Sequence, residues 1–246
     1  MLRRLLAAVA LLAAIIVVGA LGYFSISQNL LPEARASLAS TPAATFSREG
    51  DRYVFAPTAT DATTGLILYP GGKVDAAAYA PTARELAELG YLVEIVPMPA
   101  NLAVLGIDRA SDVIVAHPEI RRWAIGGHSL GGSMAAQYLA SHPGSAVGLV
   151  LWASYSASVL NGDAEPSFFS LLVYGSLDAG AASYTSPEHL ANLGAPPQVV
   201  VIEGGNHEQM GWYTGQPNDP PAEISRDEQQ RQLIVATATF LDSLAP

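Results

Sequence analysis

The sequence contains no cysteine among its 246 residues. Disulfides, thiolate metal sites and cysteine nucleophiles are therefore excluded. Charged residues are also scarce, at 14% of the chain, and Lys73 is the only lysine. The 12 basic and 22 acidic residues give a formal net charge of −10. Such an excess of negative charge repels phosphate backbones, so we expect no nucleic-acid partner.

Hydrophobic residues, in contrast, make up half of the chain. This fraction excludes an intrinsically disordered protein, which combines low hydrophobicity with high net charge. The glycines and prolines follow no short period, so a collagen-like rod is excluded as well. The length suits one domain of ordinary size with an appendage, large enough to bury a core without metals or disulfides.

The first hydrophobic feature is Leu5–Phe24, which is 20 residues without a charge. A helix of that length spans roughly 30 Å, the thickness of a bilayer's hydrocarbon core. Arg3 and Arg4 precede it, and Tyr23 and Phe24 resemble interfacial anchors at its far end. The pattern predicts a transmembrane anchor over residues 1–24, with the amino terminus inside and the rest of the chain extracytoplasmic.

A cleaved signal peptide, leading to secretion, is the alternative interpretation. Its apolar core would be about 7–15 residues long and followed closely by a small-x-small site. The nearest Ala-x-Ala, Ala34-Arg35-Ala36, lies well beyond the apolar run. Without Arg3 and Arg4, ten basic and 22 acidic residues remain, so the exported part carries −12. Residues 25–47 are polar and small, which predicts a tether, and the folded domain is expected over residues 48–246.

From Tyr53 onward, short apolar runs alternate with helical patterns, and the runs are continuously apolar. This predicts an α/β fold, with a mostly parallel sheet and helices on both faces. The expected strands are Tyr53–Ala56, Leu66–Tyr69, Tyr91–Val96, Trp123–Ile125, Ala146–Trp152, Phe168–Tyr174 and Val199–Ile202. The expected helices are Tyr79–Leu89, Ile107–Ala116, Leu130–Ser141 and Arg226–Leu244.

The first strand end that carries chemistry is Gly127-His128-Ser129-Leu130-Gly131, between an expected strand and an expected helix. A serine on such a sharp turn exposes its hydroxyl, and glycines flank it because a Cβ would clash there. The helix amino terminus behind it directs N–H groups at developing negative charge. Ser129 is therefore the candidate nucleophile. His128 is interpreted as local packing or as part of the substrate pocket.

The second strand end is Leu171–Asp178, where a short glycine-containing loop carries a carboxylate. A histidine base needs an acceptor that fixes its tautomer and stabilises the imidazolium, and Asp178 is placed to provide it. Asp163, on the preceding loop, is the alternative acid.

The third strand end is Val199–Glu208, where the last strand leads into a glycine-rich loop that carries His207. The other histidines lie at helix ends or in a short surface helix, apart from His128. His207 is therefore the candidate general base.

These motifs resemble the α/β-hydrolase superfamily over the chain from about Tyr53 to the carboxyl terminus. The residues that carry the resemblance are Gly127–Gly131, Gly175-Ser176-Leu177-Asp178, Gly204-Gly205-Asn206-His207 and Pro70-Gly71-Gly72. The order Ser129, Asp178, His207 is the order of that superfamily. Among its branches the chain is similar to the small, capless esterases and dienelactone hydrolases. It departs from the latter in having a serine where they have a cysteine nucleophile.

The resemblance implies an oxyanion hole built from the N–H of Leu130 and that of Gly72, with Lys73 as the alternative second donor. Lys73 and Trp212 join His128 as candidate substrate contacts. Trp212 lies with Met210 and Tyr213 in the loop after His207, which either lines an acyl pocket or anchors itself to the core.

Trp152 and Phe168 are separated by only 15 residues, too few for a helical lid, so we expect an open site. The expected activity is serine hydrolysis of carboxylic esters through an acyl-enzyme, which requires no metal or organic cofactor. Because a histidine base must be neutral, activity should fall in mild acid. The alternatives are an acyltransferase on the same scaffold and a non-catalytic, membrane-anchored binding protein.

Overall fold

The computed structural model describes residues 19, 28–160 and 168–244. The predicted anchor over residues 1–24 lies outside them apart from Gly19, and so does the alternative acid Asp163. Within the described residues, no helix is both long and apolar enough to cross a membrane.

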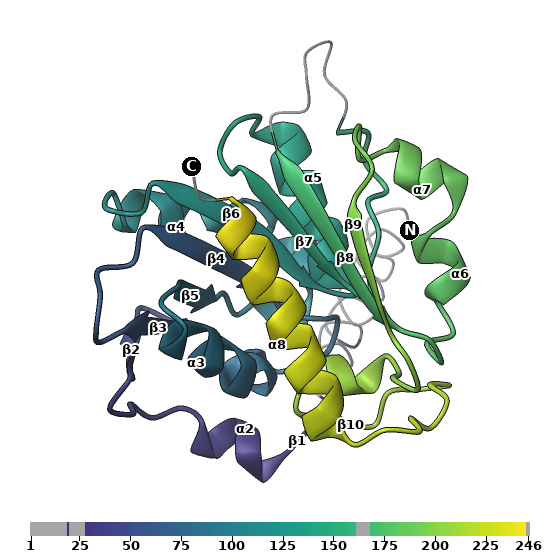
Figure 1. Cartoon of the computed structure of the whole chain (residues 1–246), viewed down its shortest axis with the longest axis horizontal. Coiled ribbons are helices and arrows are strands. Elements are labelled where there is room, and N and C mark those ends of the chain that lie inside the picture. Colours follow the sequence, from purple (N-terminus) through teal and green to yellow (C-terminus); the bar gives the residue numbers. More distant parts are fainter. Residues whose placement is uncertain (1–18, 20–27, 161–167, 245–246) are drawn as a thin grey trace, which may run out of the picture.

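The described residues contain an eight-stranded sheet in the order β2-β3-β5-β4-β6-β7-β8-β9 (Figure 1). Neighbouring strands from β5 to β9 in this order run parallel, whereas β2 and β3 form an antiparallel hairpin and β3 pairs antiparallel with β5. The strands span Ala44–Glu49 (β2), Arg52–Pro57 (β3), Thr64–Tyr69 (β4), Leu92–Ile95 (β5), Arg122–His128 (β6), Gly148–Trp152 (β7), Phe169–Gly175 (β8) and Gln198–Ile202 (β9). The predicted mostly parallel sheet is confirmed.

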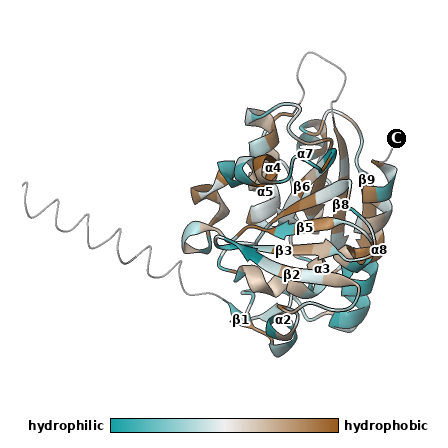
Figure 2. Cartoon of the chain, turned by 90° about the vertical axis from the view of Figure 1, so that its left-hand side faces the viewer, coloured by the Kyte–Doolittle hydropathy of each residue, from teal (hydrophilic) through white to brown (hydrophobic). Residues whose placement is uncertain are grey.

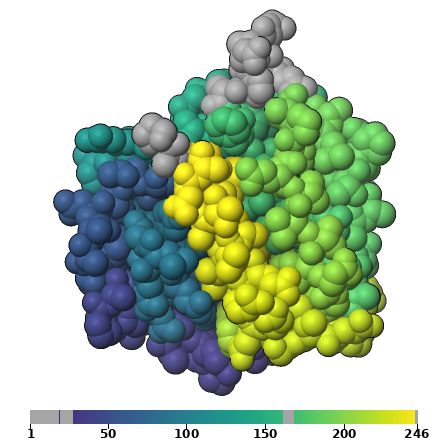
Figure 3. All heavy atoms as spheres, viewed as in Figure 1, coloured from purple at the N-terminus to yellow at the C-terminus, as the bar shows by residue number. Residues whose placement is uncertain are grey.

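Helices cover both faces of this sheet, and Figure 2 shows α4 and α5 on one side and α8 on the other. The helix α8 crosses its face beside α3, and in the space-filling view it lies between the amino-terminal and carboxyl-terminal halves of the chain (Figure 3). The central strand β4 is buried along all six residues, as expected for a parallel strand with both faces covered. The helices are α3 (Ala80–Glu88), α4 (Ala110–Ala116), α5 (Leu130–Ser141), α6 (Ala181–Tyr184), α7 (Pro187–Ala191) and α8 (Arg226–Ser243).

The described residues also contain five short 3-10 turns. They span Ala76–Tyr79 (η1), Pro99–Asn101 (η2), Ala103–Leu105 (η3), Ile107–Arg109 (η4) and Glu208–Met210 (η5). Of these, η1 runs into α3 and η4 runs into α4. The helix expected over Tyr79–Leu89 is therefore η1 followed by α3, and it ends before Gly90 at a φ of +108°. That left-handed conformation favours glycine, as the sequence pattern predicts for a helix end.

The segment expected to be a tether instead holds three elements within its described part. They are β1 (Asn29–Leu30), which pairs with β10 (Tyr213–Thr214), the helix α2 (Pro32–Ala36), and the start of β2. Ala34 in α2 is fully buried. The polar composition conceals these elements, because only the small residues Ala34, Ser37 and Ala44 are buried and the pairing strand β10 lies far away in the sequence.

Candidate active site

The candidate nucleophile Ser129 stands between β6 and α5 with φ of +52° and ψ of −124°. This conformation is costly for a residue with a Cβ and persists only where the surroundings enforce it. The Ser129 N–H donates to the carbonyl of Trp152 at 3.0 Å, and the Ser154 hydroxyl donates to the Ser129 carbonyl at 2.7 Å. The backbone of the turn is therefore fixed on both sides.

Glycines are required at the two ends of this turn. A Cβ on Gly127 would lie 2.4 Å from the carbonyl oxygen of Tyr69, and one on Gly131 would lie 2.1 Å from the same atom. No real Cβ contact is that short, so any side chain would push β4 away from β6. The pattern Gly-x-Ser-x-Gly thus reflects close packing of the turn against the end of β4.

The candidate acid and base are hydrogen-bonded to each other. Asp178 follows β8 and is 6% exposed, and His207 Nδ1 lies 2.8 Å from its Oδ2. The Gly180 N–H donates to Oδ1 of Asp178 at 2.7 Å, which fixes the carboxylate. Because a carboxylate accepts, His207 carries a proton on Nδ1, and Nε2 is left to accept a proton from a nucleophile.

Two further residues hold this pair, and sequence reasoning missed both. The Tyr184 hydroxyl lies 3.0 Å from Oδ2 of Asp178 and 3.2 Å from Nδ1 of His207. Burial and the neighbouring Asp178 raise the pKa of Tyr184, so its hydroxyl stays protonated and donates to the carboxylate. Asp219 accepts the backbone N–H groups of His207 at 3.2 Å and of Glu208 at 2.7 Å. Burial raises the pKa of Asp219.

Ser129 directly follows His128, whose ring packs against that of His207. The ring centroids of His128 and His207 are 4.5 Å apart with an interplanar angle of 49°. No hydrogen bond joins the Ser129 hydroxyl to His207 in the described part of the chain. Catalytic hydrogen bonds of this kind often tighten only when substrate binds.

His128 itself is buried, 1% exposed, and it does not line the cavity beside Ser129. Its Nδ1 lies 2.8 Å from the Tyr79 hydroxyl, which accepts the Gly71 N–H at 3.0 Å. Among the described residues the Tyr79 hydroxyl has no other acceptor, so we assign its proton to the hydrogen bond with His128 Nδ1. Burial, together with the nearby His207, holds the pKa of His128 well below its usual range. His128 is therefore a neutral ring packed against the candidate base.

Of the backbone N–H groups of Gly71, Gly72 and Lys73 in the loop after β4, two are already hydrogen-bonded within the protein. The Gly71 N–H is taken by Tyr79, and the Lys73 N–H donates to the carbonyl of Asn101 at 2.8 Å. Among the described residues, neither the Gly72 N–H nor the Leu130 N–H has a hydrogen-bond partner. A Cβ on Gly72 would lie 3.3 Å from Cδ2 of Leu130, so the two residues are adjacent.

A cavity of about 370 Å³ opens beside Ser129. Its wall consists of small, polar and aromatic side chains from the turn after β6, the loop after β7 and the start of α6: Ser129, Leu130, Ser133, Ala153, Ser154, Tyr155, Gly180, Ser183 and Tyr184. Trp212 lies elsewhere, against a hollow of about 290 Å³ between α2, α3 and α8. Met210 and Tyr213 are fully buried, so the loop after His207 is anchored to the core.

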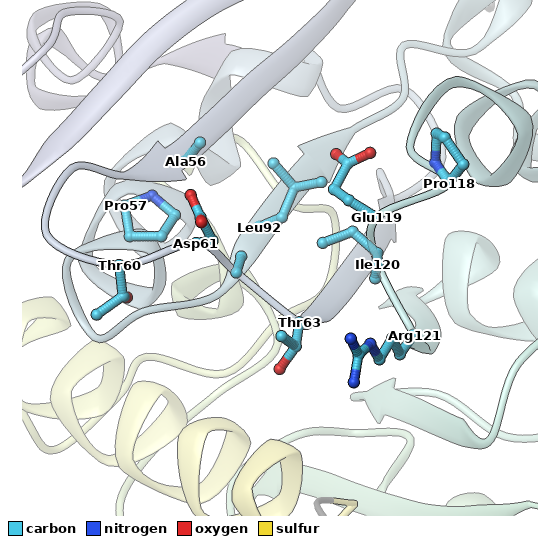
Figure 4. A pocket seen from close by; sticks show the side chains of 11 residues that line it. Ala56, Pro57, Thr60, Asp61, Thr63, Leu92, Pro118, Glu119, Ile120 and Arg121 are labelled. Carbon is cyan, nitrogen blue, oxygen red and sulfur yellow. The ribbon is translucent and has the colours of Figure 1, made fainter.

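A larger hollow of about 670 Å³ lies at the opposite edge of the sheet (Figure 4). Thr63, Leu92 and Arg121, which line it, stand at the amino ends of β4, β5 and β6. None of the three candidate catalytic residues reaches this hollow.

In the described part of the chain, one group of side chains has ligand atoms close enough for a metal ion: Glu49, Glu94 and His117, whose ligand atoms lie within 4.8 Å of one another. The Arg52 guanidinium pairs with Glu49 at 3.0 Å and with Glu94 at 3.3 Å. Burial raises the pKa of Glu94, which is fully enclosed. Arg52 already supplies the positive charge that these carboxylates need, so the group is a structural ion-pair network between β2, β3 and β5.

The sequence profile of the α/β-hydrolase family matches residues 65–231, which is more than half of the chain. The chain belongs to the α/β-hydrolase family. A search of curated proteins finds no relative that matches this hydrolase. The fold and the family confirm the predicted resemblance.

Three solved structures share the fold of this hydrolase. A dienelactone hydrolase from Anabaena variabilis has a TM-score of 0.56 at 15% identity, and the match covers 81% of this chain and 96% of that chain. An esterase from Mycobacterium marinum has a TM-score of 0.55 at 14% identity, covering 87% and 86%. A bacterial membrane phospholipase A has a TM-score of 0.52 at 15% identity, covering 97% and 99%.

Proposed function

We propose that this α/β hydrolase cleaves carboxylic esters, with Ser129 as nucleophile, His207 as general base and Asp178 as the acid that orients it. The observation that carries the proposal is the 2.8 Å hydrogen bond between His207 Nδ1 and Asp178 Oδ2, beside a serine held in a strained turn. Strained backbone at an exposed hydroxyl is typical of a nucleophile rather than of a structural serine.

In this mechanism Ser129 Oγ attacks the ester carbonyl while His207 Nε2 takes its proton. His207 then gives that proton to the leaving alcohol, and water, activated by the same nitrogen, releases the acid from the acyl-enzyme. Asp178 and Tyr184 stabilise the imidazolium. The unpaired N–H groups of Gly72 and Leu130 support the proposed oxyanion hole, and each such donor contributes about 3 kcal/mol in the transition state.

The pairing of the Lys73 N–H with Asn101 argues for Gly72 over Lys73 as the second donor. We therefore assign no oxyanion role to the Lys73 backbone. The proposed contacts of substrate are the residues around the 370 Å³ cavity, in place of the buried His128 and the remote Trp212.

A fluorophosphonate probe tests the nucleophile. It should label the full chain, and Ser129→Ala should abolish both labelling and hydrolysis of p-nitrophenyl acetate. Ser141→Ala is the matched control, because Ser141 ends the helix α5 that begins after Ser129, lies outside the cavity and should leave labelling intact. Labelling that persists in Ser129→Ala would overturn the assignment. Product formed with added alcohols in preference to water would instead favour the acyltransferase.

The proposed location is a membrane-anchored, extracytoplasmic domain, with residues 1–24 retained. Cleavage after Ala36 would remove β1 and α2, in which Ala34 is fully buried and Leu31 donates its N–H to the Trp212 carbonyl at 3.0 Å. The loss of these contacts argues against the secreted alternative at that site. Fractionation with mass spectrometry tests the anchor: recovery of a soluble chain without residues 1–36 would contradict it.

A further inference from the structure

We call the edge of the sheet that carries Ser129, Asp178 and His207 the catalytic edge. Residues 28–30 contact two loops at this edge. The Gln28 N–H donates to the carbonyl of Lys73 at 2.8 Å, in the loop that follows β4. Asn29 and Leu30 then pair with Thr214 and Tyr213, in the loop that follows His207. The chain therefore enters the domain between the two loops that flank the candidate oxyanion hole and the candidate base.

The distance from the predicted anchor to this point is short. Only residues 25–27 separate Phe24 from Gln28, so the four residue spacings between them reach at most about 14 Å. The headgroup layer on each side of the hydrocarbon core is roughly 5–8 Å deep. A chain that leaves the hydrocarbon at Phe24 therefore reaches the catalytic edge at, or just outside, the headgroups.

Two exposed apolar side chains lie close to the loop that holds Gln28. Val104 and Leu105 in η3 are each 51% exposed. The preceding turn η2 contains Asn101, whose carbonyl accepts the Lys73 N–H, and η3 packs against α5, the helix that begins after Ser129. The apolar pair is thus linked to Gln28 through η2 and the Lys73 loop. A bilayer's interfacial region is an apolar environment that could cover it.

We infer that the catalytic edge faces the leaflet in which the anchor ends, and that the substrate is an acyl ester of a bilayer lipid. This inference rests on the proposed serine hydrolase function and on the proposed anchor. Ser129 Oγ forms a bond to the acyl carbon of the lipid, and the ester bond to the lipid's alcohol breaks. The Ser129 proton passes through His207 to that alcohol, which leaves as a lysolipid, and water then releases the fatty acid.

The test compares a lipid in a vesicle with a soluble ester, using the full chain reconstituted in phosphatidylcholine vesicles. A 20-residue Gly/Ser insertion between Ser27 and Gln28 lengthens the connection without changing the domain. Lengthening a tether this much should lower hydrolysis of vesicle phosphatidylcholine on the order of tenfold. Turnover of p-nitrophenyl acetate should stay unchanged. The same insertion after Pro246 is the control and should alter neither reaction.

A second variant tests the apolar pair without a change in tether length. The double substitution Val104→Ser and Leu105→Ser should lower hydrolysis of the vesicle lipid severalfold and leave p-nitrophenyl acetate turnover intact. Val115→Ser is the control, since Val115 is 80% exposed on α4 and lies away from the catalytic edge. If neither the insertion nor the double substitution lowers hydrolysis of the vesicle lipid, while p-nitrophenyl acetate is still turned over, this inference alone would be overturned. Absence of turnover on both substrates would overturn the proposed function.

Discussion

The Tyr79 hydroxyl lies 2.8 Å from Nδ1 of His128 and accepts the Gly71 N–H at 3.0 Å. One hydroxyl thus joins the loop after β4 to the ring that packs on His207. His128 accepts a hydrogen bond at Nδ1, and burial, together with His207, keeps its pKa low. A neutral His128 does not oppose the positive charge that would develop on His207 in the proposed acyl transfer. Neither Tyr79 nor Gly71 needs to contact substrate in this arrangement.

Removal of that hydroxyl should weaken both folding and catalysis. Tyr79→Phe leaves two buried polar groups, the Gly71 N–H and His128 Nδ1, without a partner, and should cost about 2 kcal/mol in the free energy of unfolding. Because the oxyanion loop and the base lose their common support, kcat should fall about tenfold, which corresponds to about 1.4 kcal/mol in the barrier. Denaturant unfolding and ester kinetics measure the two effects.

Tyr91→Phe is the control for this prediction. The Tyr91 hydroxyl donates to Asp242 at 2.6 Å and lies 3.0 Å from the Ala238 carbonyl, at the far end of α8. Its loss should destabilise the fold by about 1 kcal/mol while kcat stays unchanged. Equal losses of kcat in the two variants would show that Tyr79 acts through stability only.

Substitution of two neighbouring glycines in the loop after β4 should have different effects. A Cβ on Gly71 would lie 2.7 Å from His128 Nδ1 and 3.1 Å from the Tyr79 hydroxyl, whereas one on Gly72 meets only Leu130, at 3.3 Å. Gly71→Ala should therefore disrupt the Tyr79–His128 contact and lower kcat strongly, while Gly72→Ala should be tolerated because it keeps its N–H. Ester kinetics on both variants decide this, and a reversed order would contradict the assignment of the loop.

Tyr184 should act on the rate through Asp178. Tyr184→Phe removes a hydrogen-bond donor to the Asp178 carboxylate. We expect kcat/KM to fall about tenfold, because the His207 imidazolium would lose about 1.4 kcal/mol of stabilisation. Tyr174→Phe is the control, since Tyr174 has no hydrogen bond through its hydroxyl in the described part of the chain and its ring packs against Tyr184. Similar kinetics for the two variants would remove Tyr184 from the site.

Burial of His128 should make stability depend on pH. Its pKa in the folded protein lies below the unfolded value, so the unfolded state binds a proton first as the pH falls. Stability should then decrease below a pH of about 6.5, by at most about 1.4 kcal/mol per pH unit for this group. His128→Asn, whose Oδ1 can accept from Tyr79, should lose less stability than the native chain between pH 7 and pH 5 in urea unfolding. Parallel losses would contradict this assignment.

Much of the fold follows from local pattern. Leu130–Ser141 is a helix with the expected bounds, and Gly90 ends α3 as predicted, because periodicity and glycine conformation are local properties. The positions of Ser129, Asp178 and His207 were predictable for a related reason: the carboxyl ends of parallel strands meet at one edge. The segment 28–47 was not predictable, because its partners Lys73, Trp212 and Tyr213 are remote in sequence.

The sequence by itself determined the alternation of the parallel strands with the longer helices, the strained turn at Ser129 and the strand ends that carry Asp178 and His207. Each of these depends on residues within a few positions of one another. The tertiary structure alone decided that Tyr184 and Asp219 contact the candidate acid and base, that Tyr79 hydrogen-bonds the buried His128, and that Gln28 joins the catalytic edge. Those contacts form across separate loops, and a hydrogen bond between distant residues leaves no local pattern in the chain.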